Sequence, residues 1–311
     1  MIGDLARYLF WVHLREIVDP DDPEVVRALA TVGARFRSSR GAFGLAVMRE
    51  ELRRTFPGLG DNETALERAV LTADEIRVQC HLEELFLGRL DATRTARLVR
   101  VEGLAHLEAA RAHGRGAVLV FPHAGAVQLL VARLGFAGLP VVHVTRGAAP
   151  AELRREDPHD RWPDRRIRRA REDAEDRLPV RICGADAPAG TLEAALARNE
   201  VVAIAFDGRG GSSFAPAQWL DRPASLSTRP WTLAVAAGAA VVPAVVVREP
   251  DRSHRLVIAA PVRRDDPWAA RDAALAAIAP VLRRNPEGYG PWLAHCRRFS
   301  SANPLFTDLA P

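Results

Sequence analysis

The sequence contains no lysine, so all 43 of its permanently positive side chains are arginine. Without an ε-amine the chain cannot form a lysine Schiff base or bind a nucleotide phosphate with a P-loop lysine. The net charge of +4 is too modest to indicate nucleic-acid binding. These absences leave general acid–base chemistry and arginine-based anion binding as the available kinds of site.

Cysteine is also scarce, with three residues, Cys80, Cys183 and Cys296, spread far apart along the chain. No Cys-x-x-Cys spacing occurs, so the sequence predicts neither a disulfide framework nor a structural zinc site. We expect no metal and no cofactor. The cysteine usage favours a reducing cytoplasm as the location.

Long apolar runs are absent as well. The most apolar N-terminal stretch, residues 5–18, is interrupted by Arg7, His13 and Glu16, whereas a membrane span needs roughly 20 apolar residues. It also lacks the order of features that defines a signal peptide. We expect this stretch to pack on the main domain, or at most to lie on a membrane surface as a peripheral contact.

The chain of 311 residues, 48% of them hydrophobic, is long enough to bury a substantial core. Residues 1–100 read as a helical region packed on that core, with helices over 23–37, 43–55 and 63–89 and no strand. Residues 101–311 alternate short β-branched runs with helices, which predicts an α/β domain with a mainly parallel sheet flanked by helices. The expected strands are 117–121, 140–145, 179–182, 201–206, 241–248 and 254–259, and the expected helices are 124–135, 164–176, 190–199, 228–238 and 268–284.

Two titratable residues follow central strands of this pattern. His123 comes directly after the strand at 117–121, at the start of the next helix, where the positive helix end favours a neutral ring. Asp207 follows the strand at 201–206, and right-handed crossovers place both strand ends beside one crevice. The alternatives are a histidine that only packs at the corner and an aspartate that caps the turn at 208–211.

The corner resembles the first motif of the glycerolipid and lipid A acyltransferases, in which an acid stands five residues after the histidine. Here that position is Gln128. Segments at 54–57, 101–107, 206–224, 242–249 and 285–299 resemble, in order, further blocks of the lipid A lauroyl/myristoyl acyltransferase branch. The resemblance implies a glycerolipid acyltransferase-like fold and assigns the general base to His123.

The missing acid is the main departure from the family. A carboxylate beside the histidine orients the ring and stabilises it when it is charged; Gln128 can orient the ring but carries no charge. We expect Asp207 to supply the acid, with Glu287 and Asp221 as weaker candidates. His143, on the next strand, is expected in the core. The candidate substrate-binding residues are Arg209, Arg248, Arg146 and Gly125.

Three functions stay open at this stage. The first is a soluble acyltransferase that uses an acyl or aminoacyl carrier protein, or a coenzyme A thioester, to modify a small soluble acceptor. The second is a member of the fold recruited to natural-product biosynthesis, where it performs a displacement, elimination or ring closure on a carrier-bound intermediate. The third is a non-catalytic partner subunit. The substitution Gln128→Glu should raise acyl transfer under the first hypothesis and not under the second.

Overall fold

A seven-stranded sheet forms the centre of the computed structural model, which describes residues 8–19, 21–39, 43–145, 162–184, 187–299 and 303–308. The strand order is β1-β9-β8-β2-β5-β3-β4, and all neighbours are parallel except the antiparallel pair β8 and β9. The strands are β1 (Val99–Glu102), β2 (Ala117–Phe121), β3 (Val141–Thr145), β4 (Arg181–Gly184), β5 (Val201–Ala205), β8 (Ala240–Arg248) and β9 (His254–Ile258).

The central strands are apolar throughout because helices cover both faces of the sheet. In β2 every residue is buried, and successive side chains alternate between two core clusters: Val118 and Val120 enter one, and Leu119 and Phe121 enter the other. The first face is covered by α11 (Thr191–Ala197), α12 (Arg229–Ala237) and α13 (Pro267–Arg284). The second is covered by α8 (Leu104–Arg111) and α9 (Val127–Phe136).

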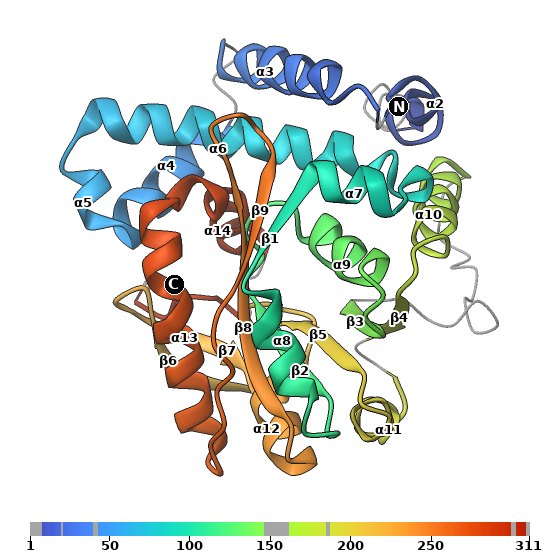
Figure 1. Ribbon diagram of the computed structural model, residues 1–311. Helices are drawn as coiled ribbons and strands as arrows, with labels where there is room; N and C mark the ends of the chain where they lie inside the picture. The colour runs from blue at the N-terminus through green and yellow to red at the C-terminus, as the bar shows by residue number, and fades with distance from the viewer. Residues whose placement is uncertain are drawn as a thin grey trace.

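The N-terminal helices lie across one edge of this layered core. Helix α6 (Glu63–Glu84) crosses the top of the view in Figure 1, with α3 (Pro23–Ser39) on its outer side. Helix α4 (Phe43–Thr55) packs against α6 and against α14 (Gly290–Phe299), which comes from the other end of the chain. The remaining helices are the π-helical turn Leu9–Leu14, α2 (Arg15–Ile17), α5 (Pro57–Gly60), the 3-10 turn Leu87–Arg89, α7 (Ala92–Leu98), α10 (Trp162–Glu175) and the 3-10 turn Pro286–Gly288.

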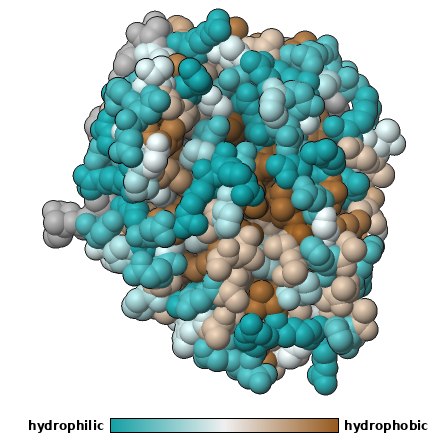
Figure 2. Space-filling model, turned by 60° about the vertical axis from the view of Figure 1, so that its left-hand side comes forward, coloured by the Kyte–Doolittle hydropathy of each residue, from teal (hydrophilic) through white to brown (hydrophobic). Residues whose placement is uncertain are grey.

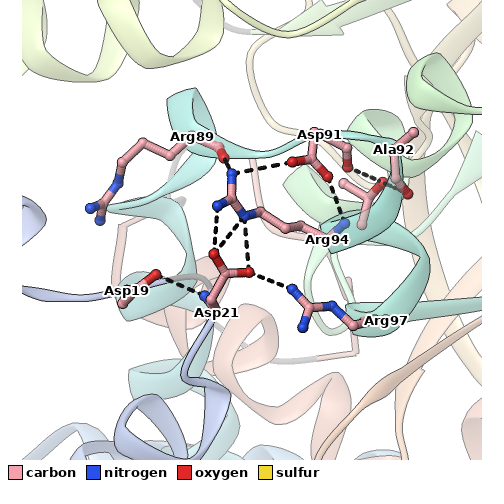
Figure 3. Close-up of polar contacts among 8 residues, drawn as sticks. Asp19, Asp21, Arg89, Asp91, Ala92, Arg94 and Arg97 are labelled. Atoms are coloured by element: carbon pink, nitrogen blue, oxygen red, sulfur yellow. Dashed lines mark hydrogen bonds and ion pairs between the residues drawn. The ribbon is translucent and has the colours of Figure 1, made fainter.

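The segment between α2 and α3 is attached to α7 by ion pairs, which Figure 3 shows in detail. Arg94 donates from Nε to both carboxylate oxygens of Asp21 at 3.0 Å, and Arg97 donates to the same carboxylate. The Arg94 hydrogen bond lowers the pKa of Asp21 from 3.8 to about 2. These contacts join the segment before α3 to α7, which packs against α9.

All six expected strands and the expected α/β class are present, and the strand boundaries agree within two residues. The expectation that residues 1–100 contain no strand is wrong, because β1 begins at Val99 and crosses the boundary drawn at residue 100. Its partner is the distant β9, a pairing that four residues of local sequence do not reveal. The antiparallel hairpin of β6 (Phe214–Trp219) and β7 (Arg222–Ser227) was also not expected. Two further differences concern helix ends: α6 ends at Glu84, and α9 begins at Val127.

Across the described ranges, no helix has both the length and the apolar character needed to cross a membrane. The face in Figure 2 is mostly hydrophilic, with smaller apolar patches between the polar residues.

We predict that Asp21→Asn loosens the N-terminal segment without unfolding the sheet. The substitution removes the charge that Arg94 and Arg97 contact, so hydrogen exchange in residues 12–19 should rise while exchange in β2 and β5 stays unchanged. In the wild type the contact should be complete above pH 3.8 and be lost as the pH falls through about 2, because the pKa of Asp21 is lowered in the folded state. The exposed Asp61→Asn is the matched control, and equal exchange in both variants would contradict the prediction.

Candidate functional site

His123 and Asp207 meet where the neighbouring strands β2 and β5 end. The ring atom Nδ1 of His123 lies 2.7 Å from Oδ1 of Asp207, and the backbone N–H of His123 donates to both carboxylate oxygens at 3.2 and 3.0 Å. Because an ionised carboxylate can only accept hydrogen bonds, Nδ1 carries the proton and Nε2 carries the lone pair. The expected proximity of these two residues is therefore present.

Asp207 is fully buried and receives a further hydrogen bond from the C-terminal part of the chain. The hydroxyl of Tyr289 donates to Oδ2 of Asp207 at 2.8 Å, and Nε1 of Trp219 donates to that hydroxyl at 3.1 Å. Burial and the Asp207 carboxylate raise the pKa of Tyr289 well above its usual value, so Tyr289 remains a hydrogen-bond donor. Asp207 therefore does more than cap the turn that follows it.

The ring of His123 is held in place by an aromatic side chain of α14. Trp292 stacks on this ring with the two ring centroids 3.8 Å apart and the planes 17° from parallel. His295 in turn stacks on Trp292, with ring centroids 5.0 Å apart. With one nitrogen bonded to Asp207 and one face covered by Trp292, the ring has little freedom to rotate. Its Nε2 has no partner among the described residues, and the side chain remains 32% exposed.

His123 lines a pocket of about 1090 Å³ at the ends of β2 and β5, with residues from both faces of the sheet in its wall. We divide the lining residues by the face they come from and call the two groups the α9 arm and the α12 arm. The α9 arm comprises residues of α6 with Leu87, Phe121, Gln128 and His143; the α12 arm comprises residues 208–213 with Ser227, Thr228, Arg229 and Thr232. The volume suits a small-molecule ligand.

Gln128 is not bonded to His123. It lies in the first turn of α9 and lines the pocket, but its Oε1 is buried and has no hydrogen-bond partner within the described part of the chain. The helix itself begins four residues after His123, so the expected effect of the helix end on the histidine ring does not apply directly. The neighbour that orients His123 is Asp207.

His143 lies in the core, as expected, and also reaches the pocket wall. Only 4% of the residue is exposed, and burial lowers the pKa of its ring to about 4, with a smaller contribution from His123. The ring is therefore neutral at ordinary pH. Its Nδ1 is buried without a hydrogen-bond partner among the residues described.

The four candidate substrate-binding residues occupy different places. Arg209 lines the α12 arm, donates from Nε to the carbonyl of Asp207 at 3.1 Å and stacks over Phe214 at 4.6 Å. Arg248 is not among the residues that line the pocket; it lies 3.5 Å from Glu75 of α6. Arg146 lies outside the described residues. Gly125 lines the pocket with a φ of +64°, and its N–H donates to the carbonyl of Gly288 at 3.0 Å.

The two other acids named from the sequence are not bonded to His123. Asp221 forms an ion pair with Arg283 at 2.8 Å, and its side chain is 75% exposed. Glu287 lies in the 3-10 turn before Tyr289, and burial raises the pKa of its carboxyl group. Of the acids considered, only Asp207 contacts the histidine ring.

Three aromatic residues of the site were not identified as site residues from the sequence. Tyr289 and Trp292 fall within the C-terminal segment that carries the family resemblance, and this was the one available signal for them. Trp219 falls within the segment 206–224, which also carries the resemblance. No group of metal-ligating side chains is found in the part of the chain that the structure describes.

Comparison with known families gives one match. A family model described as bacterial lipid A biosynthesis acyltransferase matches residues 24–299, which includes every strand and every pocket-lining residue named above. No curated protein matches the chain significantly.

We predict that Tyr289→Phe destabilises the fold by about 1–3 kcal/mol, the usual cost of leaving a buried polar group without its partner. The change removes one donor to the Asp207 carboxylate and also the acceptor used by Trp219. Urea unfolding followed by tryptophan fluorescence measures the difference. Thr64→Val, which removes an exposed hydroxyl, should stay within about 0.5 kcal/mol of the wild type. A Tyr289→Phe variant as stable as Thr64→Val would contradict the prediction.

Proposed function

Because the chain belongs to the bacterial lipid A biosynthesis acyltransferase family, we propose that it transfers an acyl group from a thioester to a small or soluble acceptor, with His123 as the general base. The observation that carries this proposal is the 2.7 Å contact between His123 Nδ1 and Asp207 Oδ1, on a ring that lines the pocket and has its other nitrogen, Nε2, still available. A base with one nitrogen fixed by a carboxylate and the other accessible can accept a proton from an attacking hydroxyl.

In the proposed reaction, Nε2 of His123 takes the proton of the acceptor hydroxyl as its oxygen attacks the thioester carbonyl. The tetrahedral intermediate then collapses, the carbon–sulfur bond breaks, and the leaving thiolate takes the proton back from Nε2. The products are an ester and a free thiol. Asp207 remains ionised and stabilises the imidazolium that exists between the two proton transfers.

Asp207 supplies the acid that position 128 lacks. An acid can orient and stabilise the histidine ring from either of two places, because each place allows it to reach Nδ1. One place is five residues after the histidine, and the other is the end of the neighbouring strand. Here Nδ1 already has its partner in Asp207. A second carboxylate at position 128 is therefore not required, and Gln128→Glu is now expected to leave the rate of transfer no higher.

We assign the thioester donor to the α12 arm. This arm combines the glycine-rich turn 208–211 with Arg209, Arg229 and several hydroxyl groups. One guanidinium nitrogen of Arg209, Nη2, is buried and has no hydrogen-bond partner among the described residues. Phosphate is the group on coenzyme A and on the prosthetic arm of an acyl or aminoacyl carrier protein that such a site would bind.

We predict that Asp207→Asn lowers acyl transfer by about 10³- to 10⁴-fold, since the comparable Asp-to-Asn change in serine proteases lowers kcat about 10⁴-fold. His123→Ala should abolish transfer. The measurement is mass-spectrometric detection of acylated product from coenzyme A and carrier-protein thioesters with a panel of lipid and soluble acceptors.

The matched control is Asp221→Asn, which changes the same side chain at an exposed ion pair outside the pocket and should retain full activity. Transfer by the wild type that is lost without His123 and reduced without Asp207 supports the proposal. Absence of transfer with every donor and acceptor would contradict the proposal. It would favour either an enzyme of this fold recruited to natural-product biosynthesis or a non-catalytic partner subunit.

A further inference from the structure

The α9 arm carries two buried hydrogen-bonding atoms that the protein leaves unused. Oε1 of Gln128 and Nδ1 of His143 have no partner among the residues that the structure describes, and both residues line the pocket. Buried polar atoms are nearly always hydrogen-bonded, because removing them from water without a new partner costs free energy. Two such atoms in one arm of a ligand-sized pocket indicate that a ligand supplies the partners.

Most charged groups of the same arm are paired within the protein. On α6, Arg77 pairs with Asp74 at 2.8 Å and Glu83 pairs with His254 at 2.8 Å. Glu84 lies 3.5 Å from Arg171, and burial raises its pKa to about 7, so this carboxyl group is partly protonated at neutral pH. Burial lowers the pKa values of His81 and His143 to about 4, so both rings are neutral at ordinary pH. A charged ligand group placed here would lose its hydration and gain no fully ionised, unpaired partner from these groups in return.

The two unused atoms differ in what they can do. The amide of Gln128 presents an acceptor, while a neutral imidazole has one nitrogen that donates and one that accepts. Hydroxyl groups suit both residues, because a hydroxyl can donate its hydrogen to Gln128 and can either donate to or accept from the ring of His143. Apolar neighbours such as Leu87 and Phe121 line the same arm and suit the carbon skeleton of the ligand.

We propose that the α9 arm binds an uncharged, hydroxyl-bearing group of the ligand, with Gln128 and His143 as the residues that recognise it. Naming this ligand the acyl acceptor rests on the proposed function; the binding preference itself does not. Position 128 is then a specificity-determining position, and a glutamine is compatible with catalysis there because the histidine obtains its acid from Asp207.

The test uses three probes of equal length that differ in charge: hexane-1,6-diol, hexane-1,6-diamine and adipate. Their binding to the full chain is followed by NMR of ring ¹⁵N nuclei in histidine-labelled protein, with the His143 signal assigned by its loss in His143→Gln. The diol should shift the His143 signal, and the diamine and adipate should not. Gln128→Leu should weaken diol binding by about 2- to 10-fold, the effect of one hydrogen bond.

Two controls accompany these measurements. Gln218→Leu makes the same chemical change at an exposed position of β6 outside the pocket and should leave diol binding unchanged. The ring of His106, whose Nδ1 is bonded to the carbonyl of Ile258 at 2.9 Å, should not respond to any probe.

A preference for the diamine or for adipate, no response of His143 to the diol, or equal diol binding by the wild type and Gln128→Leu would each overturn the proposal. The experiment requires no turnover, so its outcome is separate from that of the acyl-transfer assay. Diol binding at His143 without acyl transfer would refute the proposed reaction and retain the hydroxyl subsite.

Discussion

The buried carboxylate of Asp207 is the interaction on which the rest of the site depends. A carboxylate without exposed surface is stable only when strong donors replace its lost water. Here they are the backbone and ring of His123 and the hydroxyl of Tyr289. These donors join the ends of β2 and β5 to the segment before α14, so that satisfying one charge also sets the orientation of the histidine and the position of one pocket wall.

Under the proposed function, the acid at the end of β5 and the residue at position 128 have separate tasks. In this chain the orientation of His123 depends on the sheet, where β2 and β5 are paired in register. The first turn of α9 is then free to face the ligand. Under the proposed function, Gln128 is therefore compatible with catalysis, and position 128 contributes to the choice of substrate.

The sheet could be predicted from the sequence because its central strands are continuous apolar runs. The alternation of these strands with helices also predicts that the carboxyl ends of the strands lie beside one crevice. This reasoning brought His123 and Asp207 together. It could not find Tyr289 or Trp292, because their roles arise from contacts with residues more than eighty positions away. The sequence reasoning also assigned Arg248 to the ligand. In the structure Arg248 lies beside Glu75 of α6, a contact that depends on how α6 crosses the sheet and that the sequence does not reveal. Short strands such as β1, and the β6–β7 hairpin, depend on partners that local patterns do not specify.

The position of α14 has a consequence for biosynthesis of the protein. Every strand of the sheet precedes Tyr289 in the chain, yet the support of Asp207 and the stacking on His123 come from Tyr289 and Trp292. During synthesis the sheet can assemble while these residues are still within the ribosome. The emerging chain would then hold its histidine and aspartate without their aromatic supports, and the geometry of the site would be completed only after residues 289–292 have left the ribosome.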